Sequence, residues 1–384
     1  MKTKFLALLL SFGLVACGDE VLDYRNVEIV NKQIYAQGEN SSFTGKVTNV
    51  PFDKVINEEV GRVLNIYARS TGDGKLLESL VIVGVNAMGN SQQKNSLLLC
   101  DIKVNNGILD GDVSCHLNGK EDTILKYKYS NGKLDGTLTL YMPTNKNEDI
   151  VKVAEAEMSN GTLNGKTKVW SARTGKQVLE ITMKDGLANG TTIQNGANGK
   201  TFQQETYESG KILKTTYFNP STGKEIGSVN QDAQGNIING TSVTYYAFNN
   251  AGLLDEPKII DIKEYQNSKP SGKVIQYDVE TGKILSELTF KDGSPYNGLY
   301  YRREPDGRSI KNPPEEYING ETKSQIEARK RIEEAEAQRK KLEEESQIVI
   351  EACIERLKND ENYASYDIDV LESECQQELN GMSQ

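Results

Sequence analysis

Asn106-Gly107-Ile108-Leu109-Asp110-Gly111 joins an Asn-Gly step to a second glycine about four residues later, and this combination returns throughout residues 96–303. Asn-Gly and Asp-Gly steps supply the positive φ angles that a tight strand reversal needs. Recurrence at intervals of tens of residues is typical of a modular repeat architecture. The further copies begin at Asn131, Asn160, Asp185, Gln234 and Asp292.

The segments between these steps have the composition of β-strands. Residues 137–141 and 242–248 are β-branched or aromatic at nearly every second position, as expected for half-buried strands. A second turn, Thr-Gly-Lys, recurs between units and begins at Thr174, Thr222 and Thr281. We therefore expect a mainly β fold, an elongated antiparallel meander of repeated β-hairpins.

Residues 277–301 resemble the variant MORN repeat that is found in bacterial proteins labelled antitoxin-like. The residues that carry the resemblance are Thr281-Gly282-Lys283, Glu287, Phe290, Gly293 and Gly298, and Phe43-Thr44-Gly45-Lys46-Val47 looks like an N-terminal member of the set. The resemblance implies MORN-like hairpins, through turn residues that concern fold more than activity. Residues 51–95 fit the pattern poorly, and Lys214 replaces the second glycine of one unit.

The start of the chain has the features of an export signal. Lys2 and Lys4 precede an apolar run, residues 5–16, that is too short to span a membrane as a mature helix. Residues 14–17 resemble a bacterial lipobox, which implies cleavage before Cys17 and lipid on its sulfur and new amino group. An ordinary signal peptide with a chance cysteine is the alternative.

The residues after Cys17 concern location. In enteric bacteria, an aspartate directly after the lipidated cysteine is linked to retention in the inner membrane. This chain has Gly18 at that position, so the resemblance implies the outer membrane. The aspartate at the next position, Asp19, argues against this location. No later stretch approaches the ~18 apolar residues of a transmembrane helix. We expect a protein of the bacterial cell envelope that is anchored by lipid rather than embedded.

The composition of the chain limits which shapes and which classes of partner are expected. The 384 residues carry a net charge of −10, which disfavours nucleic acid and anionic lipid as partners. The hydrophobic content of 36% and the mean hydropathy of −0.57 are low for one large core. A thin, elongated body with much surface per residue fits these values better.

Four cysteines follow Cys17, an even number in an exported chain. Cys100 and Cys115 lie nearly symmetrically about the Asn106-Gly107 turn, so we expect them to face each other across a hairpin. Cys353 and Cys375 lie in two helical segments that flank a polar turn, and we expect a second disulfide there. Four buried free thiols are the alternative. Zinc is disfavoured by the spacing and because His116 is the single histidine.

The end of the chain changes from β to helical composition. Pro305, Pro313 and Pro314 mark a linker. Residues 321–345 are almost entirely Glu, Lys, Arg, Gln and Ala, with opposite charges at i,i+4 that support an exposed helix. Apolar residues repeat every seven from Ala328 to Val349, so a coiled coil and a solvated single helix both stay open. Two amphipathic segments then predict a C-terminal α-helical hairpin.

These boundaries divide the chain into five parts. They are a signal peptide (1–16), an N-terminal segment with a first repeat-like unit (17–50), MORN-like repeats (51–303, divergent over 51–95), a linker (304–320), and a charged helix with a helical hairpin (321–384).

No catalytic constellation or cofactor motif is evident. The S-x-x-K matches at Ser130 and Ser221 are repeat turns without the companion motifs of a serine enzyme. A carboxylate pair on one sheet face stays possible. One interpretation of the tyrosines at 245, 246, 277, 300 and 301 is a platform that binds glycan or protein. The alternative is that tyrosine simply suits the half-exposed face of a strand.

We therefore expect a lipid-anchored envelope protein that acts as a non-catalytic binding or scaffold module, without cofactor or metal. A protein partner is expected, and contact with glycan or peptidoglycan is possible. The alternatives are an immunity or antitoxin-type protein that neutralises a toxin, and an enzyme that acts on cell-wall material.

Overall fold

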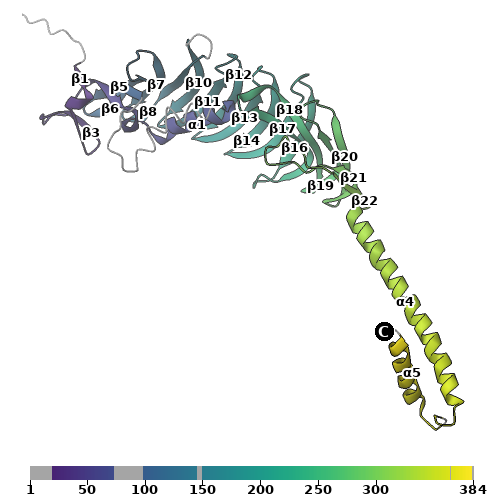
Figure 1. Ribbon diagram of the computed structural model, residues 1–384. Coiled ribbons are helices and arrows are strands. Elements are labelled where there is room, and N and C mark those ends of the chain that lie inside the picture. The colour runs from purple at the N-terminus through teal and green to yellow at the C-terminus, as the bar shows by residue number, and fades with distance from the viewer. Residues whose placement is uncertain (1–19, 73–97, 145–148, 364, 383–384) are drawn as a thin grey trace, which may run out of the picture.

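A computed structural model describes residues 20–72, 98–144, 149–363 and 365–382. Figure 1 shows an elongated, curved sheet, with a long helix that projects from its C-terminal end. The first strand, β1 (Val21–Asp23), lies at the opposite end of the sheet. The molecule is mainly β with C-terminal helices, as the sequence predicted.

The main sheet is an open antiparallel meander of 21 strands within the described residues. Consecutive strands pair with each other from β4 onward, except that the two-residue β8 lies beside β7, and β9 pairs with both β7 and β10. At the N-terminal edge, β1 pairs in parallel with β4. The strands are β4 (Gly45–Pro51), β5 (Leu98–Asn105), β6 (Ile108–Leu117), β7 (Thr123–Ser130), β8 (Lys133–Leu134), β9 (Gly136–Pro143), β10 (Ile150–Ser159), β11 (Thr162–Trp170), β12 (Gln177–Lys184), β13 (Leu187–Asn195), β14 (Thr201–Glu208), β15 (Lys211–Phe218), β16 (Glu225–Gln231), β17 (Ile237–Asn249), β18 (Gly252–Gln266), β19 (Lys269–Tyr277), β20 (Ile284–Lys291), β21 (Ser294–Tyr300), β22 (Glu315–Ile318) and β23 (Glu321–Thr322).

The Asn-Gly steps form the expected reversals and also join one hairpin to the next. Asn131 and Gly132 have φ angles of 49° and 77°. The Gly132 N–H donates to the Leu109 carbonyl of the preceding hairpin at 2.8 Å, and the Gly161 N–H donates to the Leu134 carbonyl at 2.8 Å. Each turn therefore stabilises its neighbour, which couples the repeats along one edge of the sheet.

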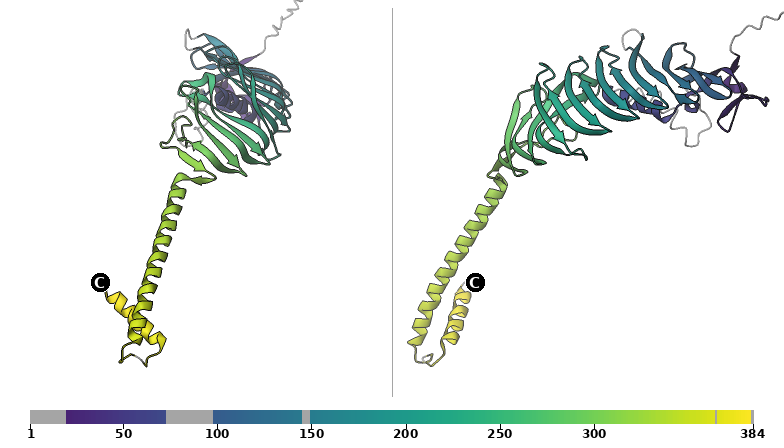
Figure 2. Two further views of the ribbon diagram at one scale, coloured as in Figure 1. Left: turned by 90° about the vertical axis from the view of Figure 1, so that its right-hand side faces the viewer. Right: turned by 180° about the vertical axis from the view of Figure 1, so that it is seen from behind.

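The structure differs from the expected divergent repeat over residues 51–95. Residues 52–71 form a 3-10 helix, η2 (Phe52–Lys54), and an α-helix, α1 (Glu58–Thr71), and residues 73–97 lie outside the described ranges. Figure 2 shows α1 lying in the trough of the curved sheet. This helix covers part of the concave face, where it contacts β10, β11, β12 and β18.

Local sequence explains why α1 forms and which side it buries. The Asn57 side chain accepts from the Val60 N–H at 2.9 Å and caps the first turn. Gly72 ends the helix with a φ of 76°. The buried residues recur at helical spacing and form one stripe. They are Val60, Val63, Leu64, Tyr67 and Thr71.

The largest core lies between α1, η2 and the N-terminal half of the sheet. Tyr127 and Tyr129 contribute to it, and their hydroxyls donate to the Val55 carbonyl at 3.2 and 3.4 Å. A smaller cluster centres on Tyr217, Val229 and Val243, farther along the sheet. The apolar interior is thus divided along the trough, as a thin body requires.

The sheet extends farther than the sequence predicted. The expected linker at 304–320 contains β22, and β23 follows it, so the sheet ends at Thr322. Thr322 then caps the helix α4 (Lys323–Lys358), because its hydroxyl accepts from the Gln325 N–H while the Gln325 side chain accepts from the Thr322 N–H. With 36 residues, α4 is about 54 Å long.

A second tail helix, α5 (Ile368–Met382), folds back along the far end of α4. The polar break between them matches the predicted helical hairpin. Leu371, Cys375 and Ile350 are the buried residues at this contact. Most of α4 is exposed, as expected for its charged sequence.

Candidate functional site

Of the five cysteines, one lies outside the described residues and the other four form two disulfides. Cys17, the predicted lipidation site, lies outside the described residues. Cys100 and Cys115 occupy directly paired positions on β5 and β6 and form a disulfide. Cys353 and Cys375 form a second disulfide, between α4 and α5. Both bridges have the local pairing that the spacing predicted.

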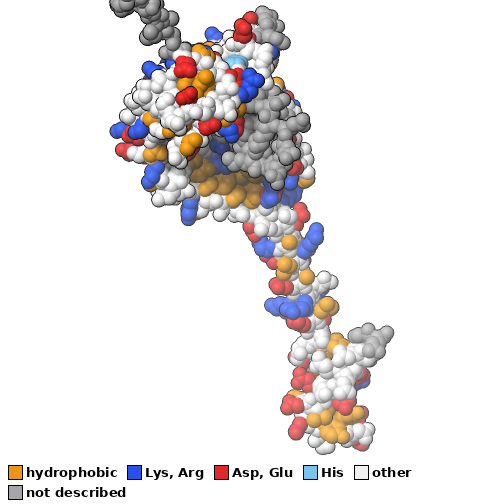
Figure 3. All heavy atoms as spheres, turned by 90° about the vertical axis from the view of Figure 1, so that its left-hand side faces the viewer, with side chains coloured by type: hydrophobic (Ala, Val, Ile, Leu, Met, Phe, Trp, Pro, Cys, Tyr) orange, Lys and Arg blue, Asp and Glu red, His pale blue; other side chains and the backbone are white. Residues whose placement is uncertain are grey.

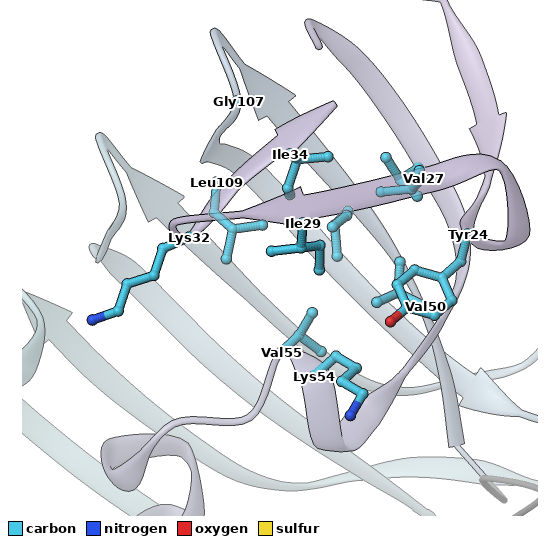
Figure 4. A pocket seen from close by; sticks show the side chains of 12 residues that line it. Tyr24, Val27, Ile29, Lys32, Ile34, Val50, Lys54, Val55, Gly107 and Leu109 are labelled. Carbon is cyan, nitrogen blue, oxygen red and sulfur yellow. The ribbon is translucent and has the colours of Figure 1, made fainter. Parts of the chain in front are cut away.

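A pocket of about 230 Å³ lies at the N-terminal end of the sheet. Figure 4 shows its roof, a hairpin of β2 (Val27–Val30) and β3 (Gln33–Ala36) that forms a separate two-stranded sheet. We call this hairpin the flap. The floor comes from β4, β5 and β6, and one side comes from the end of η2. The pocket therefore exists because the flap stands off the main sheet.

The flap is attached along one strand. The Ile34 N–H donates to the Gly107 carbonyl at 3.0 Å, and the Phe43 N–H donates to the Ile34 carbonyl at 2.9 Å. The other strand, β2, pairs only with β3 among the described strands. Its side chains alternate, so Val27 and Ile29 line the pocket while Glu28 does not.

The walls of the pocket are apolar and buried. Val47, Val50 and Ile102 on the floor are almost fully buried, as are Ile34 and Val55 at its sides. Lys32, Lys54 and Tyr24 are the polar side chains of the lining. Figure 4 places the Tyr24 hydroxyl and the Lys54 ammonium on the same side, with Lys32 pointing outward from the flap.

A second candidate site is a polar cluster on β13 and β14. Glu205 is only 9% exposed, and its carboxylate accepts from Gln203 and Tyr207 at 2.8 Å each and from Gln194 at 3.5 Å. Cross-strand register aligns Glu205 with Thr192 and Thr215. This carboxylate is already bonded to three donors, which suits a fixed polar recognition surface better than proton transfer.

The polar cluster affects the neighbouring tyrosines. Burial, followed by the nearby Glu205 carboxylate, raises the pKa of Tyr207 above its usual range. Burial and the same carboxylate raise the pKa of Tyr217 to about 12. Both hydroxyls therefore stay protonated at neutral pH and act as hydrogen-bonding groups.

The five tyrosines that sequence suggested as a platform do not all gather. Tyr245 packs against Phe202, with ring centroids 5.1 Å apart, and donates to the Phe218 carbonyl at 2.8 Å. Within the described residues no ring contact joins Tyr246, Tyr277, or residues 300 and 301. Tyr217, which sequence reasoning did not single out, lies 6.3 Å from Tyr245.

The tip of the tail presents exposed apolar side chains. Ile368 is 55% exposed and Val370 is 45% exposed. Arg356 and Glu378 form an ion pair beside the disulfide and hold α5 against α4. Figure 3 shows hydrophobic side chains gathered at the far end of the tail and in a hollow of the body.

Within residues 20–72, 98–144, 149–363 and 365–382, no three His, Cys, Asp or Glu side chains lie close enough together to hold a metal ion. None of the helices in these ranges combines the length and apolarity needed to cross a membrane.

Comparison with known proteins does not assign the chain to a family. No family model matches the chain, and no curated protein matches it. Among solved structures, a porin-like protein from Bacteroides uniformis is 12% identical with a TM-score of 0.17, covering 53% of this chain and 88% of that one. Saccharomyces cerevisiae Sqt1 is 11% identical with a TM-score of 0.15, covering 56% and 82%. Similarities this low carry no argument about function.

Proposed function

We propose that this chain is a lipoprotein of the bacterial cell envelope, anchored through Cys17, that acts as a non-catalytic binding or scaffold module. One observation carries the proposal: the strand nearest the anchor and the disulfide-linked tip lie at opposite ends of an elongated molecule (Figure 1). Such a shape holds a recognition unit at a distance from the membrane. The outer membrane is the proposed location.

The tail has the properties of the recognition unit. A single exposed helix buries little of its own surface, so α4 contributes length rather than core. The α4–α5 tip is stabilised by its own disulfide and still exposes apolar residues such as Ile368. Exposed apolar patches rimmed by charge mark protein contacts. We propose a protein partner at the tip.

The repeats supply the rigid body of this scaffold, and we propose that they are MORN-like units. Their Asn-Gly turns and the Thr-Gly-Lys turns at Thr174, Thr222 and Thr281 support the assignment. The polar cluster around Glu205 is the proposed place for any glycan contact, because tyrosine, glutamine and carboxylate groups converge there.

A truncated chain tests the proposal. A chain that ends at Thr322 keeps β23 and loses α4 and α5. We expect it to give the circular dichroism of a β protein and to lose the proteins that the full-length bait captures by crosslinking in envelope extract.

Point variants locate the contact more finely. Ile368→Asp and Val370→Asp should reduce capture, while Ile284→Asp, which changes a similarly exposed residue (55%) on the sheet, should not. Equal capture by full-length and truncated baits would move the recognition surface to the repeats. Turnover of purified peptidoglycan by the full chain would contradict a non-catalytic role.

A further inference from the structure

We propose that the pocket beneath the flap binds the alkyl chain of a free anionic amphiphile, such as a fatty acid. This inference is independent of the proposed scaffold role, because it concerns a site at the opposite end of the molecule from the tail. It rests on the walls of the pocket, on its mouth and on the way the flap is attached.

The walls select an apolar ligand. The floor and sides are formed by buried branched aliphatic residues, and Ile29 of the flap points into the space between them (Figure 4). Apolar cavities of roughly 150 Å³ stay dry and accept small hydrocarbons. A volume of about 230 Å³ has room for a somewhat larger apolar group. Tyr24 is the one aromatic ring in the described lining, and the remaining apolar side chains are valine, isoleucine and leucine, which favour a flexible alkyl chain over a flat ring.

The mouth selects the head group. Lys54 pairs with Asp53 at 3.2 Å, which raises the pKa of the Lys54 ammonium. The Lys54 ammonium and the Tyr24 hydroxyl lie on the same side of the pocket, whereas Lys32 points outward from the flap. Lys54 and Tyr24 together can bind a carboxylate while the alkyl chain occupies the interior. The carboxylate of Glu28 does not line the pocket.

The flap gives the ligand a way in. It is a two-stranded sheet that is bonded to the body through β3, whereas β2 has no second partner among the described strands. Displacing β2 breaks no hydrogen bond of the main sheet. The site also lies near the chain segment that carries the proposed anchor, since the Lys46 N–H donates to the carbonyl of Glu20, three residues after Cys17.

Binding can be measured with decanoate and decanol. Every described contact lies within residues 20–382, so a chain of residues 18–384 retains the whole described fold. Calorimetry should show one saturable site for each ligand. Ile29→Lys, at a position that is 51% exposed, should weaken binding of the uncharged decanol about tenfold or more, because it places a charge in the apolar space.

Two comparisons separate the proposal from nonspecific binding. Ile284→Lys, at a similarly exposed position on the far part of the sheet, should leave the affinity unchanged. Lys54→Gln should weaken decanoate binding while leaving decanol binding intact. Absence of a saturable site, or equal effects of the two isoleucine variants, would overturn the pocket. Unchanged decanoate binding by the Lys54→Gln variant would overturn the anionic head group.

A photoreactive decanoate identifies the source of the alkyl chain. Added to membranes that contain the lipidated protein, it should label peptides of the flap, and 18–384 should be labelled at the same place. Labelling of 18–384 alone would show that the protein's own lipid fills the pocket, and would overturn the free ligand.

Discussion

Single glycines decide where this sheet can turn. The first glycine of each step lies in the left-handed region, and a Cβ on Gly132 would lie 3.0 Å from the Ile108 methyl group. The second glycine has a different role, because a Cβ on Gly165 would overlap the Glu157 side chain on the neighbouring strand. That second position lies next to a register shift between Ala156 and Met158, where the paired strands are out of step.

Gly132→Val should therefore lower the free energy of unfolding by ~1 kcal/mol or more, because valine is strained at positive φ. Urea unfolding monitored by circular dichroism measures the change. Gly61→Val is the matched control, since Gly61 lies in α1, has no positive φ and has no atom within 4 Å of an added Cβ. A loss of stability in the control of the same size would show that turn geometry is not the cause.

The raised pKa of Tyr217 predicts that the free energy of unfolding falls at alkaline pH. Its pKa rises from the ordinary 10 to about 12 in the folded protein, chiefly through burial. The folded state thus favours the neutral phenol, and this contribution is complete below pH 10 and lost as the pH rises from 10 to 12. Tyr217→Phe should show a smaller decline in the urea midpoint across that interval. Parallel declines in both proteins would exclude Tyr217 as a source.

At the scale of elements, the sequence predicted the features that depend on residues close together in the chain. The hairpins follow from turn residues and strand alternation, and the disulfides follow from their positions about a turn. The signal for α1 was also present, as the Asn57 cap and the spacing from Val60 to Tyr67, but it lay within a presumed divergent repeat. The cluster around Glu205 could not be predicted, because register shifts between strands decide which residues align.

The tail hairpin depends on its disulfide more than the sheet does. The bridge closes a loop of 22 residues, which should contribute ~3 kcal/mol. Replacing Cys353 and Cys375 by serine should speed hydrogen exchange in α5 and leave exchange in the sheet unchanged. Slowed or unchanged exchange in α5 would mean that the burial of its Leu371 and of Ile350 on α4 suffices to hold it.

The whole molecule has a proposed attachment at one end only. Cys17→Ala should release the protein from membranes, and fractionation followed by immunoblotting measures the released share. Mass spectrometry of the mature N-terminus provides the control, since lipid on Cys17 is the expected modification. An unmodified N-terminus at another residue would contradict the anchor and leave the sheet and tail as described.

The turn-to-turn hydrogen bonds have a consequence for how such a chain changes over generations. Each repeat touches mainly its two neighbours, so a duplication or deletion of one hairpin preserves every remaining interface. Hairpins whose strands contact α1, namely β10, β11, β12 and β18, are the exception. Two strands span about 10 Å across a sheet. Each hairpin that is gained or lost therefore changes the length of the sheet, and with it the distance to the tail tip, by about this amount.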